Sequence, residues 1–132
     1  MQLKPISEDV VNRRPVWQAL SDLFLDTDPS LSLEWRAREL AKSPYSIEEL
    51  EEILIREVYP ACRGNLLCIA GEWAGFDMDW LEGRIQSRAD SALRALHAFN
   101  LGRLMVPRSA EWRATKQAVR ANRAAAHDGA AC

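Results

Sequence analysis

The feature that most constrains the fold is a strong helix start at Ser46. Glu49 follows three residues later, which is the spacing of a capping box, where each side chain accepts a hydrogen bond from the other residue's backbone N–H. Apolar residues then recur at helical spacing as far as Pro60, namely Ile47, Leu50, Ile53, Leu54 and Val58. The pattern predicts an amphipathic helix that buries this stripe and ends at Pro60.

Similar punctuation divides the first part of the chain. We predict a helix over residues 8–25, with Ser7 as its N-cap and Trp17 in its buried stripe. A proline inside a helix removes a hydrogen bond, so a kink at Pro15 or a helix that begins there are both open. A second helix is predicted over residues 33–42, with Ser32 as its cap.

The second half is predicted to be helical as well. Residues 65–76 fit either a short strand or a short helix, and we favour the helix because no second convincing strand is present to pair with it. Asp77 is expected to cap a long helix that reaches about Leu104, and Ser109 a last helix that reaches about Ala124.

These elements predict an all-α protein, a compact irregular bundle of five or six helices. The 132 residues suit a single domain, which we place at 1–124. Within it, residues 108–124 form a loosely docked C-terminal helix, because the apolar stripe there is poor. Residues 125–132 are expected to be a frayed tail.

Composition excludes several classes of protein. No apolar run approaches the roughly 20 residues of a membrane helix, and the first nine residues lack the apolar core of a secretion signal. Three cysteines, Cys62, Cys68 and Cys132, leave a disulfide framework incomplete and do not have zinc-finger spacing. We therefore expect a cytoplasmic protein with no metal and no cofactor.

Three stretches together resemble a known family. They are WQALSDLFLDT at 17–27, SPYS at 43–46 with EEL at 48–50, and NLL at 65–67 with AGEWAGF at 70–76. The resemblance is to a family of small bacterial proteins described as a domain of unknown function, and it covers about residues 13–85. It carries over no site residues. Small domains of this kind often accompany secreted toxins as immunity proteins, so the resemblance implies that role by association.

The charges divide the chain into two parts. Residues 1–87 hold 9 Lys/Arg against 16 Asp/Glu, a net of −7, and residues 88–132 hold 8 against 3, a net of +5. On the capped helix, acidic residues and Ile55 are expected to lie opposite the apolar stripe, and Trp35 is the aromatic residue expected to be most exposed. As a surface for a basic protein partner we select Asp22, Asp26, Asp28, Trp35, Glu48, Glu51 and Glu52.

Each of these features has a plainer interpretation. The acidic face could simply be solvated, with first-turn carboxylates favoured by the helix dipole, and Glu52→Ala would then hardly change stability. By contrast, Trp17→Ala, Leu50→Ala and Leu54→Ala are each expected to cost about 2–5 kcal/mol. The aromatic cluster Trp73, Phe76 and Trp80 is either an interface or the filling of a helix junction.

The basic C-terminal segment gives the main alternative function. Its arginines and lysine could bind nucleic acid, which the net charge of −2 disfavours, or act in an adaptor. They could equally pair with the acidic half of this chain or with a second copy, so a homodimer is left open.

Catalysis is the third reading. Glu72 and Asp77 could form an acid–base pair in a small hydrolase, but Asp77 already serves as a helix cap and no catalytic signature is present. The sequence therefore predicts a non-catalytic binding protein. The resemblance implies the specific role of an immunity protein, which would neutralise a cognate bacterial toxin by covering its basic substrate site.

Overall fold

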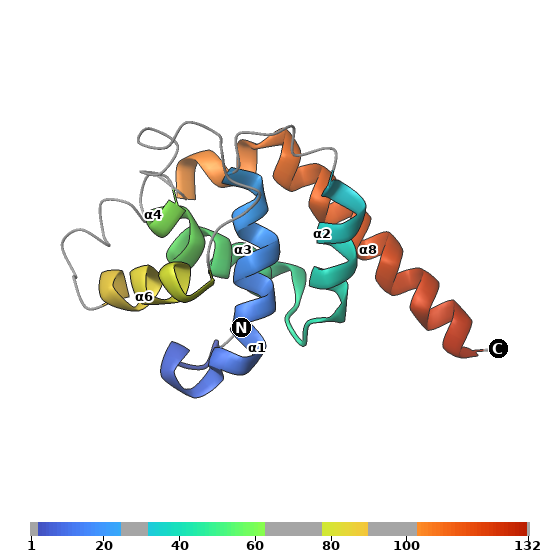
Figure 1. Ribbon diagram of the computed structural model, residues 1–132. Helices are drawn as coiled ribbons and strands as arrows, with labels where there is room; N and C mark the ends of the chain where they lie inside the picture. Colours follow the sequence, from blue (N-terminus) through green and yellow to red (C-terminus); the bar gives the residue numbers. More distant parts are fainter. Residues whose placement is uncertain (1–2, 25–31, 63–77, 90–102, 132) are drawn as a thin grey trace.

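The computed structural model describes residues 3–24, 32–62, 78–89 and 103–131, and within these ranges it contains only helices and short connections (Figure 1). The all-α fold class is confirmed. The α-helices are α1 (Ile6–Ser21), α2 (Leu33–Lys42), α3 (Ile47–Ile53), α4 (Tyr59–Cys62), α6 (Met78–Ala89) and α8 (Ala110–Ala131). Two 3-10 helices, η1 (Asp22–Phe24) and η4 (Val106–Arg108), and one π-helix, η3 (Leu54–Val58), lie between them.

Helix α1 differs from its prediction at both ends. Pro5, not Ser7, is the N-cap, and the carbonyl of Pro5 accepts the backbone N–H of Glu8 at 3.0 Å, so the helix starts two residues before the expected point. Pro15 lies inside the helix. The backbone irregularity is instead at Asp9, whose φ of −136° and ψ of 20° divide α1 into a short first turn and a long second part.

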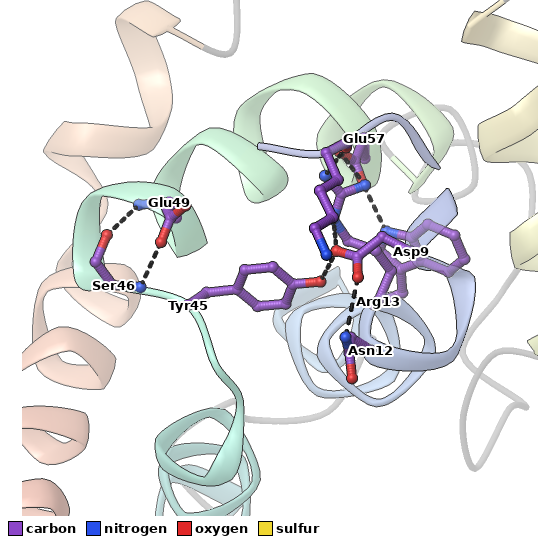
Figure 2. Close-up of polar contacts among 9 residues, drawn as sticks. Asp9, Asn12, Arg13, Tyr45, Ser46, Glu49 and Glu57 are labelled. Atoms are coloured by element: carbon purple, nitrogen blue, oxygen red, sulfur yellow. Dashed lines mark hydrogen bonds and ion pairs between the residues drawn. The ribbon is translucent and has the colours of Figure 1, made fainter. Parts of the chain in front are cut away.

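Helices α2 and α3 follow their predicted signals closely. The bounds of α2 are those predicted, and Ser32 is its N-cap residue, but the hydroxyl of Ser32 donates to Asp22 and makes no capping hydrogen bond to the helix. The capping box at α3 is confirmed, because the N–H of Glu49 donates to Ser46 Oγ at 3.1 Å and the N–H of Ser46 donates to Glu49 Oε1 at 2.9 Å (Figure 2).

The π-helix η3 corrects two expectations about the end of this segment. Ile55 is fully buried, although it was expected beside the exposed glutamates. A π-helical turn contains more residues than an α-helical turn and so rotates the following side chains around the axis, which brings Ile55 inward. Pro60 does not end the helix, because it falls in the first turn of α4, where a missing N–H is tolerated.

Helix α8 is a full part of the fold. It packs mainly along α2, with Trp112 and Val119 buried in the core, so the expected loose docking of residues 108–124 is not what the structure shows. Ser109 is the cap that was predicted, since its Oγ accepts the N–H of Trp112 at 3.2 Å. The helix continues past the predicted end to Ala131, and its C-terminal part projects beyond the other helices in Figure 1.

The core lies where α1, α2, α3, η3, α6 and α8 meet. Leu50, Ile53, Leu54 and Val58 are buried there, as the stripe predicted, together with Trp17 and Leu20 of α1 and Leu81 and Ile85 of α6. Within the described residues, no helix is both long enough and apolar enough to cross a membrane.

Several predicted features lie outside the described residues. These are the predicted short helix at 65–76 with Cys68, the carboxylates Glu72 and Asp77, the aromatic residues Trp73 and Phe76, and the part of the predicted long helix at 90–102.

Candidate functional site

A buried ionic cluster joins the start of the chain to η3. Arg13 of α1, 1% exposed, lies between two carboxylates (Figure 2). Its Nε is 3.6 Å from Asp9 Oδ2 and its Nη1 is 3.4 Å from Glu57 Oε2, without hydrogen-bond geometry at either nitrogen. The Nη2 atom donates to the backbone carbonyl of Lys4 at 2.7 Å. The guanidinium of Arg13 thus pairs with two carboxylates and also binds the backbone of the segment before α1.

Neutral donors complete the cluster. Trp17 Nε1 donates to Glu57 Oε1 at 2.7 Å, and Asn12 Nδ2 donates to Asp9 Oδ1 at 2.9 Å. The hydroxyl of Tyr45, from the turn between α2 and α3, donates to Asp9 Oδ2, and its ring lies under the guanidinium of Arg13 at 5.7 Å. A cation over an aromatic face is attracted electrostatically, so Tyr45 stabilises both the anion and the cation.

The pKa values of the two carboxylates are shifted in opposite directions. Burial raises the pKa of Glu57 above its usual value, more than the charge of Arg13 and the hydrogen bond from Trp17 lower it. Burial also acts to raise the pKa of Asp9, but the hydrogen bonds from Tyr45 and Asn12 and the charge of Arg13 together outweigh it, so the pKa of Asp9 is lowered. Burial and the bond to Asp9 raise the pKa of the Tyr45 phenol.

Carboxylates with separated pKa values are a common mark of acid–base sites. Here, however, Asp9, Arg13 and Glu57 are each at most 9% exposed. Their partners belong to α1, η3 and the turn before α3. We therefore assign the cluster to structure: it fixes the first turn of α1 and the chain before it against η3.

The predicted acidic surface is largely neutralised within the chain. Glu51 Oε1 accepts a hydrogen bond from Trp112 Nε1 at 2.8 Å and pairs with Lys116 Nζ at 3.2 Å. Glu52 is buried, contrary to expectation, between Arg56 and Arg103 at 2.7 Å each. Arg103, Trp112 and Lys116 thus lie against this side of α3. Glu48 remains exposed.

The other predicted site residues also have internal roles. Asp22 Oδ2 accepts a hydrogen bond from Nη1 of the fully buried Arg36 at 3.0 Å, and Arg36 Nε donates to Thr115 Oγ1 at 3.0 Å, which ties η1, α2 and α8 together. Trp35 is partly buried against the core. Asp26 and Asp28 lie outside the described residues. Of the five selected residues that the structure describes, Asp22, Glu51 and Glu52 are paired within the chain, Trp35 is partly buried and Glu48 is exposed.

The basic residues of α8 are used in a similar way. Lys116 pairs with Glu51. Arg123 donates to four backbone carbonyls at the end of α2 and just beyond it, those of Leu40, Ala41, Ser43 and Tyr45, at 2.6–3.3 Å. Carbonyls at a helix C-terminus lack partners within the helix, and Arg123 supplies them. Lys116 and Arg123 of the basic C-terminal segment thus bind other parts of the protein itself.

An apolar pocket of about 530 Å³ lies among the described residues, and no sequence signal pointed to it. Its walls come from η1, η3, α4, η4 and α8. Leu23, Leu54, Tyr59, Met105, Val106 and Trp112 supply the apolar lining, and Arg108, Ser109 and Glu111 the polar part. Met105 in this lining and its chain neighbour Leu104 are half exposed, at 51% and 50%. The volume is that of a typical ligand pocket.

The pocket holds none of the groups with strongly shifted carboxyl pKa values. Asp9 and Glu57 do not line it. Within the described residues, no group of three or more His, Cys, Asp or Glu side chains could hold a metal ion. What the pocket offers is apolar contact, including an indole wall, and charge at its edge.

Comparison with known protein families identifies the family to which the chain belongs. The model of a family described as "Domain of unknown function (DUF7079)" matches residues 11–122, which is most of the chain. The protein belongs to this family. The resemblance to a domain of unknown function is thus confirmed, but the expected limit at about residue 85 is wrong, because the match includes η4 and most of α8.

The family supplies no activity from which to read the site. No curated protein matches the chain, and no solved structure matches it. The match does show that α8 and the pocket residues it carries, Glu111 and Trp112, belong to the family's own domain and are not an addition to it.

Proposed function

We propose that this domain is a non-catalytic protein-binding domain that docks its partner on the apolar pocket and on Leu104 and Met105 beside it. The observation that carries the proposal is the continuity of these features, because a concave apolar wall runs into large side chains that are half exposed. Apolar surface of this kind, with polar residues around it, is typical of protein interaction sites.

The separation of the pocket from the buried ionic cluster supports binding over catalysis. An acid–base enzyme needs its titrating groups within reach of a substrate. Here the carboxylates with shifted pKa values are enclosed by α1 and η3, while the pocket is lined by other residues. This arrangement favours the binding of a partner at the protein surface over acid–base catalysis.

An immunity protein is the specific form of this proposal. In it, the domain acts in the bacterial cytoplasm and neutralises a cognate toxin by covering it. Its support is the resemblance to small toxin-associated domains, not the family match. A basic toxin surface was expected to meet the acidic residues of α3. Since Glu51 and Glu52 are paired internally, only Glu48 of that group is exposed, and the pocket surface becomes the better supported contact.

Affinity capture with matched variants tests the binding proposal. We expect proteins from an extract of the native host to be retained by the parent chain and by Glu48→Lys, but lost with Met105→Glu. Met105 is half exposed, so the glutamate should be tolerated by the fold. If every retained protein is retained equally by Met105→Glu, the pocket surface is not the docking site.

A growth assay tests the immunity role separately. The captured protein should be toxic when expressed alone, and the parent chain should restore growth when both are expressed. Met105→Glu should fail to restore it. A captured protein that is not toxic would leave a binding domain of another kind and would contradict the immunity role.

A further inference from the structure

Arg108 differs from most cations near it. Arg103 and Lys116 pair with the glutamates of α3, and Arg123 caps α2. Arg108 lines the pocket, is exposed, and makes no ion pair with another residue that the structure describes. An unpaired guanidinium at the edge of an apolar pocket can form two parallel hydrogen bonds to a carboxylate.

Glu111 is the opposing charge in the same pocket wall, three residues after Arg108 in the chain and in the first turn of α8. The carboxylate of Glu111 acts electrostatically on the buried Arg36, as does Asp22. Glu111 therefore also acts on a buried cation behind the pocket wall, while Arg108 in the same wall is exposed to solvent.

Resting on the proposed function, we infer that the partner inserts a large apolar side chain into the pocket and places a neighbouring carboxylate against Arg108. Buried apolar anchors beside a paired charge are the usual centre of a protein interface. A free small molecule would be enclosed by the pocket alone. The half-exposed Leu104 and Met105 extend the apolar surface outside it, which favours a protein partner.

Two dyes that share an apolar body test this chemistry without the partner. Anilinonaphthalene sulfonate carries an anion, and N-phenyl-1-naphthylamine is its uncharged counterpart. Both should bind the full chain at one saturable site, and Met105→Ala should weaken both about threefold by loss of apolar contact. Arg108→Gln should weaken only the anionic dye, by about fivefold, the size expected for a partly exposed ion pair.

Arg113→Gln is the matched control, because Arg113 is exposed on α8 and does not line the pocket. It should change neither affinity. The inference is overturned if Arg108→Gln affects the two dyes equally, if Arg113→Gln has the same effect as Arg108→Gln, or if neither dye saturates. Such failures concern the chemistry of the pocket, whereas the capture experiment above tests whether a protein docks there at all.

Native mass spectrometry of the chain purified from its host tests the source of the ligand. We expect the mass of the protein alone. A small organic anion bound at one equivalent and lost in Arg108→Gln would show that the pocket takes a free ligand, and would overturn the assignment to a partner side chain.

Discussion

The indole Nε1 of Trp112 donates a hydrogen bond of 2.8 Å to Oε1 of Glu51, which joins the first turns of α8 to the middle of α3. The same oxygen pairs with Lys116, whose ammonium lies 5.9 Å from the centroid of the Trp112 ring. The acidic and basic parts of the chain, at net −7 and +5, therefore meet in the folded structure. Charge that was expected to attract a partner instead stabilises the helix packing.

Removal of this contact should destabilise the fold. Glu51→Ala leaves the indole N–H and the ammonium without their shared acceptor, and we expect a loss of about 1–3 kcal/mol in the free energy of unfolding. Glu48→Ala, on the exposed side of the same helix, should change it by less than about 0.5 kcal/mol. Urea denaturation of both variants measures the difference, and equal effects would show that the contact between α3 and α8 contributes nothing.

The guanidinium of Arg123 should matter far more than its place near the C-terminus suggests. Arg123→Ala removes hydrogen bonds to four carbonyls at the end of α2, and we expect a cost of about 2 kcal/mol or more. Arg120→Ala removes an exposed arginine of the same helix and is the control. Chemical denaturation gives both values. If both variants lose equally little stability, water replaces the hydrogen bonds of Arg123 at no cost in free energy.

The raised pKa of Glu57 in the folded protein should appear in the pH dependence of the free energy of unfolding. A raised pKa in the folded state means that the protonated form favours folding, so this contribution is present below the usual pKa of about 4.5 and is lost as pH rises through the folded pKa. Glu57→Gln removes that dependence and can keep the bond from Trp17. The stability of the parent relative to this variant should therefore fall as pH rises above about 4.5.

Asp9→Asn is the control of opposite sign. Because the pKa of Asp9 is lowered on folding, its ionised form contributes stability above the usual value of 3.8, and this is lost as pH falls through the folded pKa. The deficit of Asp9→Asn should be full at pH 6 and shrink below 3.8. Urea midpoints measured from pH 3 to pH 8 test both variants, and parallel curves for the two would refute the opposed shifts.

Local sequence signals predicted helix ends correctly where those ends depend only on neighbouring residues. The capping box of Ser46 and Glu49 and the bounds of α2 depend on neighbouring residues, and both are confirmed. Ser109 also caps α8 as predicted. Such positions are chosen by bonds within one turn, so the sequence contains the whole interaction.

Interactions between distant segments could not be predicted in this way. Glu52 looked exposed because its partner Arg103 lies 51 residues further on, and periodicity within one helix carries no information about it. Ile55 was misplaced because the pattern assumed an α-helical turn where the chain forms a π-helix. The pocket could not be predicted either, because its lining residues come from separate segments between residues 23 and 112 that meet only in the folded structure.

These corrections also change how the acidic surface can be tested. Reversing the charge of Glu48, Glu51 and Glu52 together would test an acidic docking surface cleanly only if all three were free of internal contacts. Since Glu51 and Glu52 hold Lys116, Arg56 and Arg103, the triple change would break three ion pairs and destabilise the protein. Glu48→Lys alone separates binding from folding.

The affinity for the captured partner, measured by isothermal titration calorimetry, tests the central claim most directly. If docking runs through the pocket surface, Met105→Glu should weaken binding by about tenfold or more, as a buried interface anchor does. Glu48→Lys should leave the affinity within about threefold, with both variants as stable as the parent. The opposite order, a large loss with Glu48→Lys and parent affinity with Met105→Glu, would contradict the account and return the interface to the acidic face of α3.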